Sequence, residues 1–302
     1  MSAAPIRPIS PIRWPAEAIC KAVAPQLPGF TIEILPTIDS TNSELMRRAR
    51  AGRCEPVLLV AEQQTAGRGR LGRVWHSAPG DSLMFSLGLP LAPQDWSGLS
   101  LAVGVGIAES LQPVLPPAVG AIPRIGLKWP NDLWLSAGAA GGERKLGGIL
   151  VETASFVAPS AASVPLEPSF FAHPVVAARY VVVGVGLNIC PQDSAGKSLP
   201  PGCLQELDLE MEAATALLRV VAPLVAMLQL FESYGFAPMQ ARFGLRDVLQ
   251  NRSVTLSDGQ VGTAYGVGEE GALLVMTAHG MQAITSSEIS VRPASAASTG
   301  PS

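Results

Sequence analysis

Short apolar runs along the chain predict a set of buried strands. Such runs predict strands at residues 57–60, 82–89, 145–152 and 179–189, and the first is β-branched at both ends. Residues 31–35 alternate between apolar and polar positions and predict an edge strand. Residues 125–135 predict two short strands joined at a Pro-Asn-Asp corner.

Longer apolar segments predict helices between these strands, at residues 15–24, 41–51, 98–115 and 210–234. Thr41 and Glu44 have the spacing of a capping box at the start of the second helix, which Gly52 ends. Strands interleaved with helices predict an α/β (α+β) fold, with a central mixed sheet flanked by helices.

After residue 250 the period changes to two. Short strands separated by turn residues are predicted at residues 253–256, 262–267, 272–276 and 281–284, which indicates a small SH3-like β-barrel. We therefore divide the chain into an N-terminal extension, a catalytic domain, a C-terminal domain and a disordered tail, at residues 1–30, 31–248, 249–293 and 294–302. Residues 155–178, rich in Ala, Pro and Ser, are expected to be an insertion.

Composition narrows the functional classes. The net charge of −3 disfavours a general nucleic-acid-binding surface, so no nucleic-acid partner is expected. The four cysteines show no C-x-x-C spacing, and reduced thiols in a cytoplasmic protein fit best. We expect no signal peptide, and no transmembrane segment because no apolar run reaches the required length.

The strand at 57–60 leads into the most distinctive segment of the chain, an arginine–glycine loop at residues 67–75. Its glycines let backbone N–H groups approach a ligand, and its arginines suit phosphate or carboxylate. Trp75 adds a flat surface beside them. Because the whole chain is acidic, this local positive charge requires a local explanation.

Four further motifs accompany the loop: Asp39-Ser40-Thr41-Asn42, Lys128-Trp129-Pro130-Asn131-Asp132-Leu133, Lys145-Leu146-Gly147-Gly148-Ile149-Leu150-Val151-Glu152 and Gly184-Val185-Gly186-Leu187-Asn188. In this order, and together with the loop, they closely resemble the biotin–protein ligases, also called biotin–acetyl-CoA-carboxylase ligases. The resemblance extends from about residue 34 to residue 292 and includes the small C-terminal domain.

The resemblance implies a two-step reaction with biotin and ATP as substrates and Mg²⁺ as cofactor. The carboxylate of biotin attacks the α-phosphate of ATP, which yields biotinyl-5′-AMP and pyrophosphate. A lysine of a biotin carboxyl carrier protein domain then takes the biotinyl group and releases AMP. The residue types suit this chemistry, because fixed cations offset the repulsion between two anions.

The resemblance also implies roles for individual residues. Biotin-binding positions are Ser40, Thr41, Asn42, Gln64, Arg68, Gly69, Arg70, Lys145, Gly147 and Gly148. ATP-binding positions are Arg68, Arg70, Arg73, Trp75, Lys128, Asn131 and Asn188. The catalytic positions are Lys145, Arg68 and Arg70, and no carboxylate cluster marks a dedicated metal site. The family includes monomers and ligand-driven homodimers, so a homodimer is compatible with the resemblance.

Structural alternatives remain open for several of these residues. Ser40, Thr41 and Asn42 could only start a helix, and Asn131 with Asp132 could be a plain turn. Trp75 could be a packing residue, and Lys145 a solvated lysine at the start of a strand.

Rival functions are also open. The same superfamily contains lipoate or octanoate ligases and transferases, which modify a carrier lysine in the same way. A bifunctional ligase–repressor would need an N-terminal DNA-binding domain, for which about 30 residues are too few. An RNA-binding protein would use the arginine–glycine loop, but aromatic residues are sparse. The signals for a Rossmann or P-loop site are weak. Gly184-Val185-Gly186 lacks the third glycine at the right spacing, and no Gly-Lys-Ser/Thr follows any predicted strand.

Overall fold

The computed structural model of the protein describes residues 12–75, 79–115, 124–136, 142–155, 178–192, 200–256, 259–285 and 291–293. The expected tail at 294–302 lies outside these ranges, as does nearly all of the insertion at 155–178.

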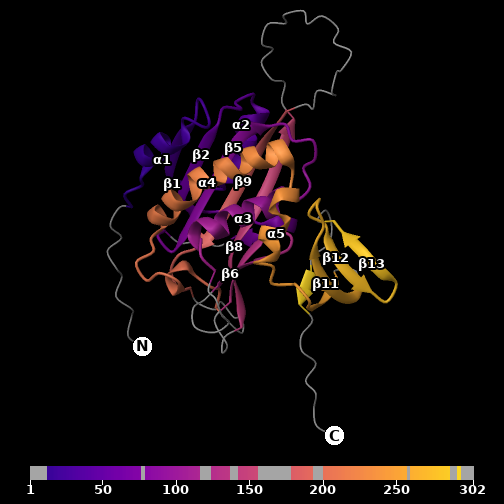
Figure 1. The fold of residues 1–302 in the computed structure, drawn as a ribbon. Helices are drawn as coiled ribbons and strands as arrows, with labels where there is room; N and C mark the ends of the chain where they lie inside the picture. Colours follow the sequence, from indigo (N-terminus) through magenta and orange to yellow (C-terminus); the bar gives the residue numbers. More distant parts are fainter. Residues whose placement is uncertain are drawn as a thin grey trace, which may run out of the picture.

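A seven-stranded mixed sheet forms the centre of the molecule (Figure 1). Its strand order is β1 (Thr31–Ile38), β2 (Val57–Gln64), β5 (Ser82–Leu91), β9 (Arg179–Asn188), β8 (Glu143–Ser155), β7 (Asp132–Ser136) and β6 (Arg124–Lys128). Only β1 and β2 are parallel, and every other pair is antiparallel. The mixed sheet, the edge position of β1 and the paired strands β6 and β7 confirm the predictions from sequence.

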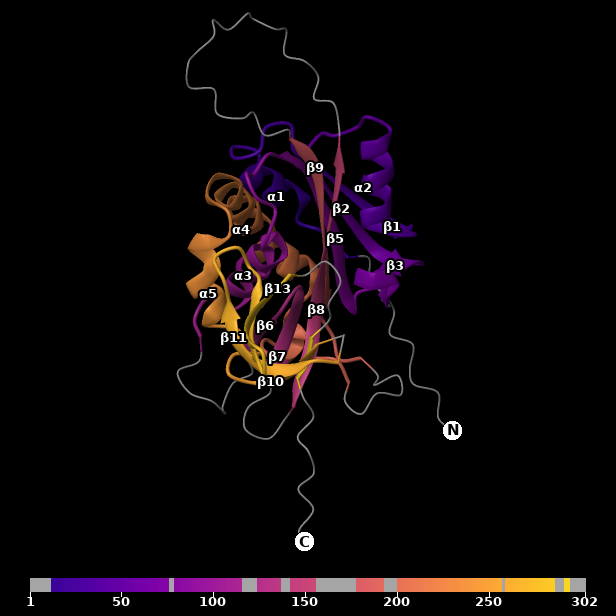
Figure 2. The same ribbon diagram turned by 90° about the vertical axis from the view of Figure 1, so that its right-hand side faces the viewer.

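Helices cover both faces of this sheet (Figure 2). One face carries α1 (Ala16–Val23), α3 (Leu99–Leu111), α4 (Ala213–Tyr234) and α5 (Gln240–Gly244). The opposite face carries α2 (Thr41–Arg50) and a short loop built from β3 (Gly67–Arg68), η1 (Arg70–Gly72) and β4 (Val74–Trp75). Short 3₁₀ turns, η2 (Leu204–Glu206) and η3 (Ala237–Met239), flank α4.

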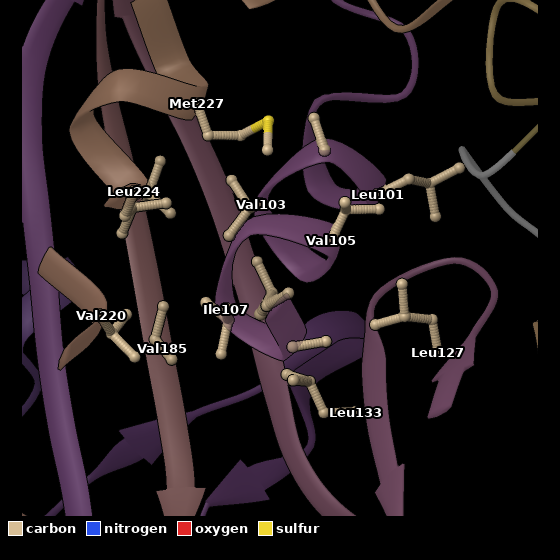
Figure 3. Close-up of a cluster of buried hydrophobic side chains, with 14 of the residues drawn as sticks. Leu101, Val103, Val105, Ile107, Leu127, Leu133, Val185, Val220, Leu224 and Met227 are labelled. Carbon is tan, nitrogen blue, oxygen red and sulfur yellow. The ribbon is translucent and has the colours of Figure 1, made fainter. Parts of the chain in front are cut away.

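The main core lies between the sheet and the pair α3 and α4 (Figure 3). Gly104 and Gly106 bring α3 close to its neighbours, because a Cβ there would lie 3.2 Å from Leu127 and 3.3 Å from Met227. The two helices therefore pack closely against each other and the sheet, and this layer supports the strands that form the candidate site on the other face.

The expectation that no apolar run reaches transmembrane length is wrong for α4. By length and composition this helix is apolar enough to cross a membrane. One side of the helix, which includes Leu217, Leu224 and Phe231, is instead buried against α3 and the sheet, whereas Leu218 is exposed. A long apolar helix of this kind is explained by its place in the core of the protein.

The start of α2 differs from the predicted capping box. Ser40, and not Thr41, is the N-cap, and its Oγ accepts a hydrogen bond from the Ser43 N–H. Glu44 does not return to the cap, because its carboxylate is paired with Arg47 and Arg48 on the same helix. The helix therefore begins one residue earlier than a Thr41 cap would allow, which leaves Thr41 in its first turn and facing the sheet.

The C-terminal strands form a separate antiparallel sheet. Its order is β13 (Gly280–Ile284), β12 (Leu273–Thr277), β11 (Val261–Val267), β10 (Ser253–Leu256) and β14 (Val291–Pro293). The strands confirm the predicted period of two, whereas the closed barrel is not formed in the described part of the chain. Closure would require pairing between the two edge strands, β13 and β14, and the described residues show no such pair.

Trp129 connects this small sheet to the central one. Its ring is buried at the corner between β6 and β7, and its Nε1 donates a hydrogen bond of 3.0 Å to the Gly271 carbonyl. Gly271 has a φ of +77° and lies against the backbone of Gly98, where a Cβ would be only 2.7 Å from its Cα. Hydrogen bonding and close backbone packing thus hold the C-terminal sheet beside α3.

Candidate active site

A cavity of about 350 Å³ opens on the α2 face of the central sheet. It brings together thirteen of the fifteen predicted site residues: Ser40, Thr41, Asn42, Gln64, Arg68, Gly69, Arg70, Arg73, Trp75, Asn131, Lys145, Gly148 and Asn188. Lys128 and Gly147 do not line it. The motifs are far apart in the sequence, so their convergence is a property of the sheet topology.

Neutral hydrogen-bonding groups form one end of the cavity, at the N-terminus of α2. Ser40, Thr41 and Asn42 are buried there. Gln64, at the end of β2, accepts the backbone N–H of Thr41 at 2.8 Å. Ser40 therefore caps a helix and lines a cavity at the same time, so the structural and functional interpretations of this motif are compatible.

Two residues that the sequence analysis did not single out shape this end. Ser86, fully buried on β5, places its Oγ 2.7 Å from the Thr41 hydroxyl and 2.6 Å from the Asn42 amide oxygen. Gly184 of β9 leaves space for Asn42, since a Cβ there would lie 1.9 Å from that oxygen. The sequence analysis placed both residues within predicted strands, and only the packing of α2 gives them this role.

The arginine–glycine loop is a small hairpin at the edge of the cavity. Gly67 pairs with Trp75, and a Cβ at Gly67 would lie 2.4 Å from the Trp75 carbonyl oxygen. Arg68 points toward the α2 end, where its guanidinium forms an ion pair of 3.0 Å with Glu152. Of the predicted cations, Arg68 is thus placed beside the neutral groups and away from Lys145.

Trp75 lies across β9 inside the cavity. A Cβ at Gly186 would lie 2.7 Å from the Trp75 ring, so glycine at this position permits the ring to rest on the strand. The indole Nε1 is buried and has no hydrogen-bond partner among the described residues. Lys145 Nζ lies 5.9 Å from the ring centroid, which places an aromatic surface next to a cation.

Cations gather at the other end of the cavity. Lys145 Nζ donates to Asp132 Oδ1 at 2.7 Å, an ion pair that joins β8 to the start of β7. Arg70 NH1 lies 3.4 Å from Asn131 Oδ1, and burial lowers the pKa of the Arg70 guanidinium. A buried cation is costly without an anion nearby, so this end suits an anionic ligand.

The two predicted asparagines are held by the protein itself. Asn131 Nδ2 donates to the Ile149 carbonyl at 2.7 Å, which fixes the corner between β6 and β7. Asn188 Nδ2 donates to the Gly202 carbonyl at 3.0 Å, and its Oδ1 accepts from Gln192 at 3.1 Å. Both side chains border the cavity, but these hydrogen bonds also have a structural purpose.

The two residues outside the cavity have other contacts. Lys128 Nζ lies 4.8 Å above the ring of Trp134 on β7. Gly147 packs against β9, where a Cβ would lie 2.5 Å from the Gly186 carbonyl oxygen. The glycine is therefore explained by close approach of two strands. Gly148, one residue later, does face the cavity.

A site for a protein-held metal ion does not emerge from the described residues, where no group of three or more His, Cys, Asp and Glu side chains comes together. Among the described residues that line the cavity, Asp132 is the only carboxylate, and it forms an ion pair with Lys145. This donor set does not fit a dedicated magnesium site of carboxylates.

The fold and the cavity together define an α/β protein with a pocket for a small-molecule substrate. Its pocket is suited to a substrate that is polar and neutral at one end and anionic at the other. Residues 35–164 match the model of the Biotin/lipoate A/B protein ligase family, and residues 251–292 match the Biotin protein ligase C terminal domain.

Known relatives agree with these matches. The chain is 33% identical over 281 residues to the bifunctional ligase/repressor BirA of Escherichia coli, covering 91% of this chain and 78% of that protein. It is 29% identical over 265 residues to the biotin–acetyl-CoA-carboxylase ligase of Paracoccus denitrificans, covering 85% of this chain and 98% of that one. The chain belongs to the biotin protein ligase family.

A solved structure shows the same fold. The biotin protein ligase of Aquifex aeolicus in complex with biotin and ATP superposes with a TM-score of 0.64 at 25% identity. The superposition covers 87% of this chain and 98% of the Aquifex chain.

Proposed function

We propose that this protein is an ATP-dependent, AMP-forming biotin–acetyl-CoA-carboxylase ligase. The observation that carries the proposal is the polarity of its cavity, with neutral hydrogen-bonding groups at the α2 end and cations around Lys145 at the other. Biotin has the matching polarity, with a neutral ureido head and a carboxylate at the end of its chain. The Aquifex relative, whose structure contains biotin and ATP, supports this assignment.

The head of biotin would bind at the N-terminus of α2. Thr41, Asn42 and Gln64 offer hydroxyl and amide groups to the ureido N–H and C=O. Buried polar groups of this kind discriminate strongly against a ligand that cannot pair with them. The dithiolane ring of lipoate has neither N–H nor C=O, so this end of the cavity favours biotin over lipoate.

Activation would take place at the cationic end. The biotin carboxylate oxygen attacks the α-phosphorus, the bond from that phosphorus to the bridging oxygen breaks, and pyrophosphate leaves. Lys145 and Arg70 offset the charge of the two approaching anions, since fixed donors stabilise charge that develops in the transition state. Lys145 must exchange Asp132 for these anions as the substrates bind.

Transfer would follow in the same cavity. The amine of a carrier lysine attacks the biotinyl carbonyl carbon, and the bond to AMP breaks. AMP leaves with the electron pair, and the amine loses a proton. Trp75 and Arg73, which line the cavity, would contact the nucleotide. No step is assigned to magnesium held by the protein, because Asp132, the one carboxylate among the described residues of the cavity, is paired with Lys145.

We also propose a biotin carboxyl carrier protein domain as the partner and the cytoplasm as the place of action. The name of the Paracoccus relative supports the first, since a carboxylase is its substrate. All four cysteines are free in the structure, which supports a reducing compartment.

The intact mass of a carrier domain, incubated with this protein, biotin and Mg-ATP, tests the proposal. A mass gain of one biotinyl group is expected, and Lys145→Ala should slow it by about 10²–10³-fold. Pyrophosphate release without a mass gain would support biotin activation and reject the chosen carrier. The absence of both products would reject the biotin ligase assignment.

A further inference from the structure

Glu152 of β8 connects two parts of the candidate site that are far apart in the sequence. Its Oε1 accepts from Arg68 NH2 at 3.0 Å, and its Oε2 accepts from Arg68 NH1 at 3.2 Å. The same Oε2 accepts from Asn42 Nδ2 at 3.0 Å. One carboxylate therefore holds the arginine–glycine loop and the N-terminal turn of α2 together.

The hydrogen bonds continue inward from Asn42 through buried groups. Asn42 Oδ1 lies 2.6 Å from Ser86 Oγ, which lies 2.7 Å from Thr41 Oγ1. Because an amide oxygen only accepts, the Ser86 hydroxyl donates to Asn42 Oδ1. The Thr41 hydroxyl then has two acceptors inside the protein, Ser86 Oγ and, at 3.2 Å, Gln64 Oε1. The donors of Ser86 and Asn42 thus point toward the negative charge of Glu152.

Glu152 and the Leu150 carbonyl together set the direction of the Asn42 amide. Both can only accept, so Asn42 turns its Nδ2 toward them, at 3.0 and 3.1 Å, and its Oδ1 toward Ser86. With its one proton directed at Ser86 or Gln64, the Thr41 hydroxyl presents lone pairs to the cavity. It is thereby prepared to accept an N–H group of a ligand, and hydrogen-bonded chains of this kind reinforce each other at low dielectric.

We propose that Glu152 is a positioning residue that couples the arginine–glycine loop to recognition of the substrate head. With the Leu150 carbonyl it orients Asn42 beside the head and, through Arg68, it holds the loop there. This inference rests on the proposed function, since the head in question is that of biotin. It adds a residue that contacts neither reacting group and acts through its two partners.

Steady-state kinetics of pyrophosphate release test the coupling to the head. Glu152→Gln keeps the shape of the side chain but removes its charge and its purely accepting character. We expect the KM for biotin to rise about tenfold and the KM for ATP to change less than about twofold. An equal rise of both KM values would indicate a general structural effect and overturn the proposal.

Glu33→Gln is the matched control. Glu33 also holds an arginine of α2 with two hydrogen bonds, to Arg48 NH1 at 2.6 Å and NH2 at 2.8 Å. Neither residue lines the cavity. This variant should retain both KM values, and a biotin KM raised as much as in Glu152→Gln would reject a specific role of Glu152.

Limited trypsin digestion without ligands tests the contact with the loop independently of any activity. Cleavage after Arg70 and Arg73, identified by mass, should be about threefold faster in Glu152→Gln and unchanged in Glu33→Gln. Arg68→Lys breaks the same two-pronged contact from a side chain that is 47% exposed, so it should fold normally and show the same acceleration.

The possible failures are distinguishable. Cleavage at the wild-type rate in both Glu152→Gln and Arg68→Lys would overturn the coupling, even if biotin is the substrate. A wild-type protein that does not use biotin would reject the proposed function, while the digestion would still measure whether Glu152 holds the loop.

Discussion

At the scale of single residues, the site depends on positions where a side chain is missing. Gly184 and Gly186 lie two residues apart on β9 and face the cavity. The first leaves room for the Asn42 amide and the second for the Trp75 ring. Glycine weakens a strand, and its presence at these two positions is explained by the groups packed against them.

Gly184→Ala should therefore disturb the head end of the site. The added methyl group would lie 1.9 Å from Asn42 Oδ1, and Asn42 must move, at a cost of about 1–3 kcal/mol in unfolding free energy. We expect biotin binding, measured by calorimetry, to weaken at least as strongly. Gly244→Ala, where a Cβ meets no atom within 4 Å, is the control and should leave both quantities unchanged.

Asp247, near the connection to the C-terminal sheet, makes stability depend on pH. Its Oδ1 accepts the Leu249 N–H, while its buried Oδ2 has no partner among the described residues. Burial raises the pKa of this carboxyl group to about 6. Since its ordinary pKa is 3.8, the stabilisation from the protonated form is present below pH 4 and is lost as the pH rises through 6.

Asp247→Asn should remove this loss. At pH 7.5 the variant is expected to be more stable than the wild type by about 1–3 kcal/mol, because no buried charge remains. The difference in Tm between the two proteins should shrink as the pH is lowered from 7.5 to 4. A difference in Tm that does not vary with pH would contradict this assignment.

At the scale of elements, the corner between β6 and β7 has two tasks. It places Asn131 and Asp132 at the cavity, and it carries Trp129, which binds the C-terminal sheet through Gly271. Consecutive residues of one corner therefore border the cavity and join the two sheets.

Trp129→Phe should weaken the contact between the two sheets. It removes the hydrogen bond to the Gly271 carbonyl and leaves space in the core, for an expected loss of about 1–3 kcal/mol in urea unfolding. Trp134→Phe is a matched control, since the Trp134 Nε1 is buried without a partner in the described part of the chain. A similar loss in both variants would argue against the hydrogen bond as the cause.

At the scale of the whole molecule, substrate binding should stabilise the fold, because the cavity is lined by strands from β2 to β7 of the central sheet and by α2. A ligand that binds only the folded protein stabilises it by about 2.7 kcal/mol at a concentration of 100 Kd.

Biotin at that concentration should raise the Tm by about 5 °C or more, and lipoate should not. The polar groups around Thr41 are the physical reason, since they find partners only in the ureido head. Differential scanning fluorimetry measures both ligands in one experiment. Stabilisation by lipoate alone would favour the alternative of a lipoate or octanoate ligase.

The local pattern of the sequence determined the order and type of nearly every strand and helix, and it marked the motifs that meet in the cavity. This succeeds because periodicity, caps and turn residues act over a few positions. The errors follow the same rule. Ser40 and not Thr41 caps α2, where Glu44 pairs with Arg47 and Arg48, and the described C-terminal strands form an open sheet in which β13 and β14 remain edges.

Only the tertiary structure decided how the charged and small residues of the site are paired. Arg68 and Arg70 are equivalent in the sequence motif, yet one faces Glu152, 84 residues away, and the other faces Asn131. Ser86, Gly184 and Glu152 acquire their roles through the register of β5, β9 and β8 beneath α2. Side-chain partners across a sheet depend on register and packing, which local patterns do not encode.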